Sequence, residues 1–154
     1  HRRALEAYRE ALAIFKQLYR DEQHQHDQEC HAGPVAAALN SIGECYVSLR
    51  EHQHALEYFQ LALEIRMSVY SDEHADIADS LERVATTYHR LREFQLAADY
   101  YTQAVDCLQK LSSNSSSFSS SASLSQSTGL QNKQQPRISR LLSQIEACAK
   151  RKDY

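Results

Sequence analysis

Residues 24–31 hold a dense group of side chains that could bind a metal ion. The stretch reads His24-Gln25-His26-Asp27-Gln28-Glu29-Cys30-His31, which offers imidazole, thiolate and carboxylate ligands of the kind that hold zinc. A stable metal site also needs a rigid surrounding shell, and this stretch has no large apolar residue that could supply one. The alternative that we favour is a solvated loop, so we predict no metal site and no cofactor.

Carboxylates and a thiol on predicted helices could act as acid–base or nucleophile pairs, such as Asp79 with Glu82 or Glu44 beside Cys45. Carboxylates spaced along a helix are more often a solvated face than an active site. The chain contains no GxSxG or HExxH motif, and its three glycines are too few for a phosphate-binding glycine-rich loop. We therefore predict that the protein is not an enzyme and has no catalytic residues.

The composition is that of an ordinary globular domain, with 154 residues of which 42% are hydrophobic and 24% charged. No apolar run approaches the roughly 20 residues that span a membrane, and the first residues do not form the apolar core of a signal peptide. Four cysteines stand far apart without a CxxC pair, which argues against a zinc ribbon or a disulfide framework. We expect a cytoplasmic protein with no membrane partner.

The net charge of −3 is distributed unevenly along the chain. Residues 1–111 carry 11 basic and 18 acidic side chains, whereas residues 112–154 carry six basic and two acidic ones. Neither part has the dense field of lysine and arginine that binds phosphate backbones. We therefore predict no nucleic-acid partner.

A repeated pattern indicates the elements that would position these side chains. Residues 35–62 and 77–104 align at an offset of 42 residues, with ten identities in 28 positions. Each copy carries apolar residues at the three- and four-residue steps of two successive helices. A period of this length with two helices is the signature of a helical solenoid. The sequence thus predicts an all-α superhelix of antiparallel helix pairs.

The N-terminal residues match the second helix of each repeat, because residues 4–6 parallel residues 55–57. The chain therefore opens in the middle of a repeat, and we expect either a fragment of a longer protein or an exposed first helix that seeks a neighbour. Residues 20–33 predict a polar loop that ends at Pro34, which is suited to a first helical position. This loop would connect the first helix to the first full repeat.

The composition changes abruptly after residue 111. Eleven of the 24 residues at 112–135 are serine, which predicts a disordered linker. Phosphorylation of these serines would add negative charge beside the basic tail, although an unregulated linker is the alternative that we favour. Pro136 then opens an amphipathic helix that we expect to cap the last repeat. Its predicted apolar stripe is Ile138, Leu141, Leu142, Ile145 and Ala149.

Asp76 is the predicted N-cap of the helix that begins at Ile77. Together, these patterns divide the chain into three parts. The predicted parts are a repeat domain at 1–111, with the second helix of a partial repeat followed by full repeats at about 35–70 and 77–111, the serine-rich linker at 112–135, and the capping helix at 136–154.

The repeats resemble tetratricopeptide repeats in the order and spacing of their small and large residues. Small residues occupy positions where helices cross closely, and aromatic residues fill the space between the helices. The matching residues are Leu39, Ile42, Gly43, Tyr46, Ala55, Phe59 and Ala62 in the first repeat, and Leu81, Val84, Ala85, Tyr88, Ala97, Tyr101 and Ala104 in the second. The resemblance implies a superhelical fold that binds protein partners.

The 42-residue period and the segment 71–78 before a first helix are similar to repeats of the kinesin light chain type. The chain departs from that type in the turn between the two helices, where the usual glycine is Arg50 or Arg92. A positive φ at these positions would cost about 1 kcal/mol each. Of the paired asparagines that kinesin light chains carry on the first helices, only Asn40 is present, so no association with a motor is implied.

Stacked helix pairs curve, and the first helix of each pair lines the concave side. Positions between its core residues would then face a groove. The predicted groove residues are Asn40, Glu44, Val47 and Ser48 in the first repeat, and Asp79, Glu82, Arg83, Thr86, His89 and Arg90 in the second. Arginines suit carboxylates and Asn40 suits a peptide backbone, so the predicted ligand is a peptide of acidic character. Simple solvated faces are the alternative for any single residue.

The predicted function is a non-catalytic scaffold or adaptor that holds a segment of a protein partner in this groove. The alternative is a self-assembling structural module, in which the uncovered first helix pairs with a second copy or with additional N-terminal repeats. That helix would use an apolar stripe that includes Leu5, Tyr8, Leu12 and Phe15.

Overall fold

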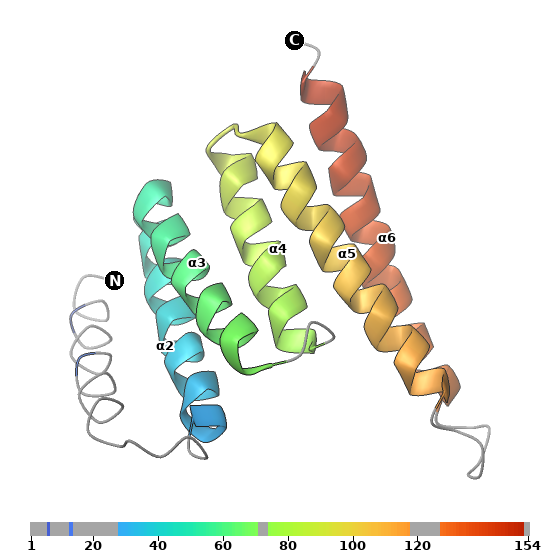
Figure 1. Ribbon diagram of the computed structural model, residues 1–154. Helices are drawn as coiled ribbons and strands as arrows, with labels where there is room; N and C mark the ends of the chain where they lie inside the picture. The colour runs from blue at the N-terminus through green and yellow to red at the C-terminus, as the bar shows by residue number, and fades with distance from the viewer. Residues whose placement is uncertain (1–5, 7–12, 14–27, 71–73, 118–126, 153–154) are drawn as a thin grey trace. The chain divides into compact units, whose positions relative to one another are not determined.

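A computed structural model describes residues 6, 13, 28–70, 74–117 and 127–152, and these residues form helices without any strand (Figure 1). The helices are α2 (Gln28–Ser48), α3 (His52–Val69), α4 (Ala75–Arg90), α5 (Phe94–Ser117) and α6 (Ser127–Lys152). The chain divides into two compact units, His1–Ser71 and Asp72–Tyr154, which are described separately. The predicted all-α fold of helix pairs is confirmed.

The first unit contains the antiparallel pair α2 and α3. Their interface is a core of small and large apolar side chains, in which Gly43 packs against Phe59. A Cβ atom at Gly43 would lie 2.5 Å from the Phe59 ring, so only a hydrogen atom fits between this backbone and the ring. The buried apolar residues of the pair are Ala36, Leu39, Ile42, Tyr46, Ala55, Leu56, Phe59, Ala62 and Leu63.

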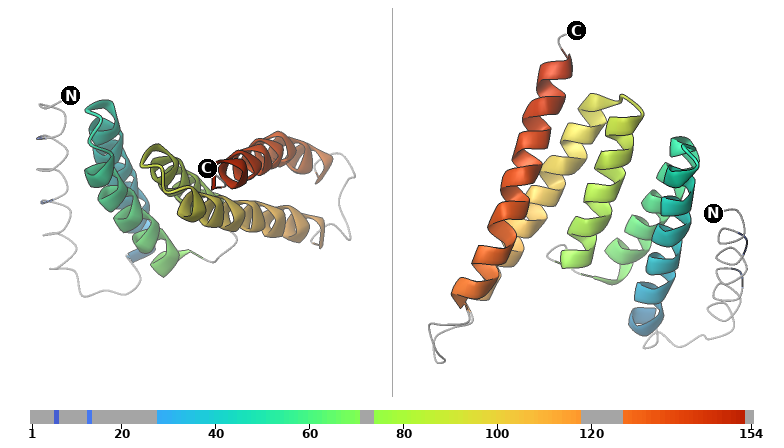
Figure 2. Two further views of the ribbon diagram at one scale, coloured as in Figure 1. Left: turned by 90° about the horizontal axis from the view of Figure 1, so that it is seen from above. Right: turned by 180° about the vertical axis from the view of Figure 1, so that it is seen from behind.

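The second unit contains three helices, in which α6 runs antiparallel to α5 along its length (Figure 2). The apolar residues of α4 and α5 repeat the burial pattern of the first pair, and α6 adds Ile138, Leu141 and Cys148 to the core. The α6 residues that point away from α5 are mostly polar or charged. This is the arrangement expected of a helix that shields the last apolar face of a solenoid.

Each helix pair has its own aromatic contact, and the two contacts lie at equivalent positions of the repeat. The rings of Tyr46 and Tyr58 stack with centroids 5.4 Å apart, and those of Tyr88 and Tyr100 stack at the same 5.4 Å. Offset ring contacts of this kind add to the gain from burial. The 42-residue sequence repeat is therefore a repeat of side-chain packing as well.

The turns between the paired helices also repeat in detail. Arg50 and Arg92 adopt φ values of 63° and 66°, in the left-handed region that favours glycine. The amide of Arg50 donates to Val47, and the amide of Glu51 donates to Tyr46 at 3.0 Å. Equivalent bonds join Arg92 and Glu93 to α4, so both helices end in a Schellman motif with arginine in the glycine position.

Replacing Arg50 with glycine is expected to raise the free energy of unfolding by about 0.5 to 1 kcal/mol, because glycine removes the left-handed strain and loses part of that gain as unfolded-state entropy. Urea unfolding followed by circular dichroism measures the change. Glu57→Gly, in the exposed interior of α3, is the matched control and should lower the same free energy by about 1 kcal/mol. Destabilisation by both variants would contradict a strained turn.

Three predicted helix starts are wrong, and one of them is that of α6, which begins at Ser127 and contains Pro136 in its interior. α2 begins at Gln28, and Pro34 lies inside it, where its ring removes one backbone amide donor from the helix. The residue that caps α4 is His74 and not Asp76: its Nδ1 accepts from the Asp76 amide at 3.2 Å. The helix therefore starts at Ala75, two residues before the predicted Ile77.

Helix extends further into the serine-rich segment than the composition of that segment predicts. α5 continues to Ser117 and α6 begins at Ser127, so helix extends into both ends of the predicted 112–135 linker. Serine hydroxyls at the start of this segment donate to backbone carbonyls of the preceding turn. The Ser112 hydroxyl, for example, donates to the Gln109 carbonyl at 2.7 Å. Residues 118–126, and nearly all of the predicted first helix at 1–19, lie outside the described residues.

The buried face of α6 differs from the predicted stripe. Ile138 and Leu141 are buried and Ile145 is half-buried, but Leu142 and Ala149 are exposed. The contact face is turned toward Cys148 and Arg137 instead, since Arg137 pairs with carboxylates of α4. Among the described residues, no helix combines the length and apolar character needed to cross a membrane.

Candidate functional site

The predicted groove residues of α2 differ in accessibility. Glu44 and Ser48 are exposed and Val47 is half-buried, while the Ser48 hydroxyl donates to the Glu44 carbonyl at 3.0 Å. Asn40 is only 7% exposed, and its Oδ1 atom receives no hydrogen bond from the described residues. An amide oxygen in this state favours a hydrogen-bond donor, so Asn40 combines a polar side chain with a nearly buried position.

The predicted acidic groove residues of α4 are paired with α6. Arg137 donates through Nε and Nη2 to Glu82 at 3.0 and 2.8 Å, and it also pairs with Asp79. Arg140 pairs with the other Glu82 oxygen. Glu82 therefore meets two guanidinium groups at once. This cluster joins the first and last helices of the second unit, which are 55 residues apart at Arg137 and Glu82.

Burial lowers the pKa of Arg137, but the charges of Asp79 and Glu82 outweigh that effect and raise the pKa above its ordinary value. Arginine is protonated at neutral pH with or without this shift, so the shift does not change the charge of Arg137. The shift indicates how strongly the two carboxylates stabilise the cation. The cluster therefore fixes the side of α6 that faces α4.

The next residues along the same side of α4 contact α5. Thr86 Oγ1 donates to the Glu82 carbonyl at 2.8 Å and lies 3.1 Å from the Tyr101 hydroxyl. Burial raises the pKa of Tyr101, although the Thr86 hydrogen bond opposes that effect. The phenol therefore stays neutral and acts as a hydrogen-bond partner. Thr86 is as much a packing residue as a surface residue.

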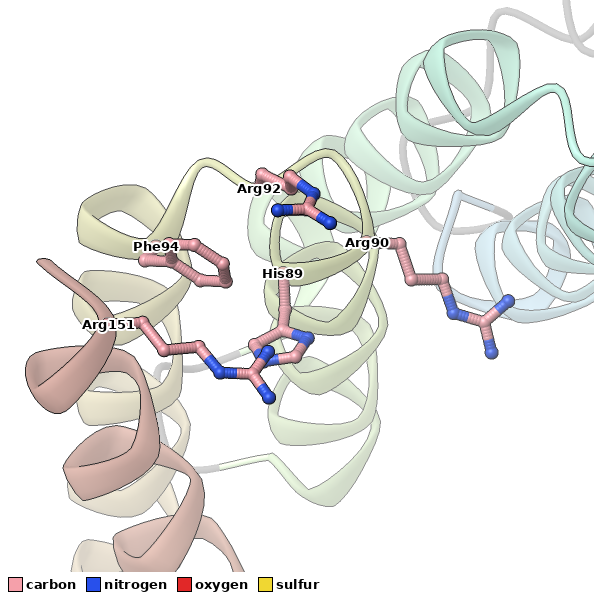
Figure 3. A pocket seen from close by; sticks show the side chains of 5 residues that line it. All are labelled: His89, Arg90, Arg92, Phe94 and Arg151. Carbon is pink, nitrogen blue, oxygen red and sulfur yellow. The ribbon is translucent and has the colours of Figure 1, made fainter. Parts of the chain in front are cut away.

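A cationic pocket of about 690 Å³ lies at the C-terminal end of α4. The residues that line it are His89, Arg90, Arg92, Phe94 and Arg151. Figure 3 shows Arg151 of α6 reaching toward His89 and Phe94, whereas the Arg90 side chain extends away from the other four. The pocket thus combines the end of α4, the turn, the start of α5 and the end of α6.

Phe94 contacts two other side chains of the pocket, His89 and Arg151. The His89 ring meets the Phe94 ring edge-on, with centroids 5.4 Å apart, and the Arg151 guanidinium lies 5.6 Å from the Phe94 centroid. Burial lowers the pKa of His89, and the charge of Arg151 lowers it further. His89 is therefore a neutral imidazole at pH 7 beside a fixed cation.

The structure brings together some predicted residues and separates others. Asp79, Glu82, Thr86 and His89 all lie on the side of α4 that contacts α5 or α6. Arg83 is half-buried and Arg90 is exposed. Sequence reasoning missed Arg92, Phe94 and Arg151 as a cluster, because Arg151 lies far from the other two residues in the sequence.

The remaining sequence candidates for chemistry do not form a cluster in the described part of the chain. No group of three or more His, Cys, Asp or Glu side chains is arranged to hold a metal there, and residues 24–27 of the histidine-rich stretch lie outside it. Cys45, Cys107 and Cys148 are free thiols. Burial raises the pKa of Cys148, which keeps this thiol protonated and unreactive.

Residues 34–110, half of the chain, match the sequence model of the family described as tetratricopeptide repeat. A search of curated proteins gives no match. The family match agrees with the repeats seen in α2 to α5.

Solved structures with a similar fold include BtubC (BKLC) from P. vanneervenii, with a TM-score of 0.52 and 17% identity over 92% of this chain. The chain spans 56% of the length of that structure. A kinesin light chain structure from Podosopora anserina, with nearly identical TPR-like repeats, has a TM-score of 0.44 and 16% identity over 96% of this chain and 90% of its own. The BtubC match supports the fold.

Proposed function

Because the chain belongs to the tetratricopeptide repeat family, we propose that it is a non-catalytic cytoplasmic scaffold that binds an acidic peptide segment of a protein partner. Proteins of this family generally bind other proteins and generally do not catalyse reactions. The proposed binding residues are those predicted groove residues on the first helices, α2 and α4, that α6 does not engage. A peptide on such a surface is held by a few apolar anchors, and polar residues fix its register.

The observation that carries the proposal is the pairing of the acidic residues on α4. Asp79 and Glu82 are engaged by Arg137 and Arg140 of α6, so their charges are largely neutralised. Arg90, on the same helix, is exposed. The remaining charge that α4 offers to a partner is therefore positive, which favours a partner with carboxylates.

The residues on α2 offer apolar and hydrogen-bonding contacts of their own to a peptide. Val47 is a half-buried apolar side chain between the exposed residues Glu44 and Ser48. The Asn40 Oδ1 atom, which lacks a donor among the described residues, could accept from a peptide amide after a small shift of its side chain. These features favour an extended segment over a bulky folded partner.

The test begins with affinity capture from cell extract, and cross-linking of the captured partner to this chain identifies the segment that binds. A synthetic peptide of that segment is then titrated against the protein. The variant Arg83→Glu/Arg90→Glu reverses two charges on α4, whereas Lys110→Glu/Lys150→Glu makes the same change at exposed positions on α5 and α6. We expect the first variant to weaken peptide binding by about tenfold or more, the effect of losing one charge-assisted hydrogen bond. The control should bind as tightly as wild type.

Asn40→Ala tests the contribution of α2 separately, with circular dichroism as a check that the helices remain. Identical partner lists for the wild type and the Arg83→Glu/Arg90→Glu variant would exclude α4 as the binding surface.

A further inference from the structure

The pocket at the end of α4 has a charge pattern that the groove function does not use. Arg92 and Arg151 bring two guanidinium groups to it, and its described lining residues include no carboxylate. Within the described ranges, neither arginine forms an ion pair with an acidic side chain. Cationic side chains that converge on an open pocket without a counter-charge favour an anionic ligand.

The Arg151 guanidinium and the Arg92 main chain are held in place before any ligand arrives. Arg151 lies against the Phe94 ring at 5.6 Å, a cation–π contact that leaves the edge of the guanidinium available for hydrogen bonds. Arg92 belongs to the left-handed turn, whose backbone bonds to His89 and Tyr88 fix its main chain. Groups that are ordered in advance lose less entropy on binding.

We propose that this pocket binds a phosphate dianion, either free or carried as a monoester. Two guanidinium groups match the charge of such a group, and their planar N–H donors match its oxygens. His89 supplies a third nitrogen that can donate to the ligand, and its contact with Phe94 keeps it at the pocket wall. The proposal does not rest on the groove function: its two guanidinium groups, Arg92 and Arg151, and Phe94 lie outside the groove residues, and only His89 is used by both.

The first repeat shows that the pocket is not a general consequence of the fold. At the positions 42 residues earlier, Val47 replaces His89, Arg50 replaces Arg92 and His52 replaces Phe94. Arg50 shares the left-handed backbone of Arg92, but the position equivalent to Phe94 holds His52. Arg50 is thus a natural control.

The test is an NMR titration of the whole chain at constant ionic strength, with inorganic phosphate, blocked phosphoserine and blocked glutamate as separate probes. We expect the His89 ring signals to shift with phosphate and phosphoserine, and the pKa of His89 to rise when either binds, because a dianion stabilises the imidazolium. Tighter binding of phosphoserine would assign the site to phosphorylated side chains, and equal or tighter binding of inorganic phosphate would assign it to free phosphate. Either result supports the proposal.

Substitutions locate the site. Arg92→Ala and Arg151→Gln should each weaken phosphate binding by about tenfold or more, whereas Arg50→Ala should leave it unchanged. Circular dichroism and the signals of α6 check that each variant is folded with α6 in place. The proposal is overturned if phosphate leaves the His89 signals unmoved, if glutamate binds as tightly as phosphoserine, or if the folded Arg92 and Arg151 variants bind like wild type.

Discussion

Gly43→Val is expected to lower the free energy of unfolding by about 3 kcal/mol. The first added carbon would already lie 2.5 Å from the Phe59 ring, and valine adds two methyl groups beyond it. Valine is no worse than glycine as a helix former, so the loss reports overpacking between α2 and α3. Urea unfolding followed by circular dichroism measures it.

A matched control and a compensating change make this prediction specific. Ala37→Val adds the same side chain to an exposed position of α2 and should cost only about 0.5 kcal/mol, the difference in helix propensity. Phe59→Leu removes the edge of the ring that Gly43 faces. In a double-mutant cycle, Gly43→Val should therefore cost less in the Phe59→Leu background. Equal costs in both backgrounds would show that the clash is relieved elsewhere.

The packing of the helix pairs could be predicted from the sequence because it repeats. The small residue at Gly43 and Ala85 and the large ring at Phe59 and Tyr101 recur at the same spacing, and all four are buried. The repeat marks the positions where helices cross, but it does not give the separation of their backbones. The intolerance of Gly43 to even one more carbon is visible only in the structure.

The candidate site was less predictable, because its partners lie far apart in the sequence. The spacing within α4 identified Asp79 and Glu82 as surface residues, but nothing in that spacing shows that Arg137 and Arg140 pair with them. The pocket likewise joins Phe94 and Arg151 through the packing of α6 on α5. A non-repeated helix has no second copy in the chain against which its contact face could be checked.

Leu141→Ala is expected to destabilise the docking of α6 by about 2 to 5 kcal/mol. Leu141 is 0% exposed, whereas its neighbour Leu142 is 46% exposed. The sequence pattern places both leucines in one apolar stripe, yet only Leu141 is enclosed by the core of the second unit. Leu142→Ala should therefore change the free energy of unfolding by less than about 0.5 kcal/mol.

Hydrogen exchange of the α6 amides separates local undocking from global unfolding. In Leu141→Ala, the amides of α6 should exchange faster while those of α2 and α3 in the other unit keep their protection. Undocking would also separate Arg137 from Glu82 and remove Arg151 from the pocket, so phosphate binding should fall with α6 protection. Similar exchange in Leu141→Ala and Leu142→Ala would mean that the ion pairs hold α6, and Arg137→Ala would then become the variant that releases it.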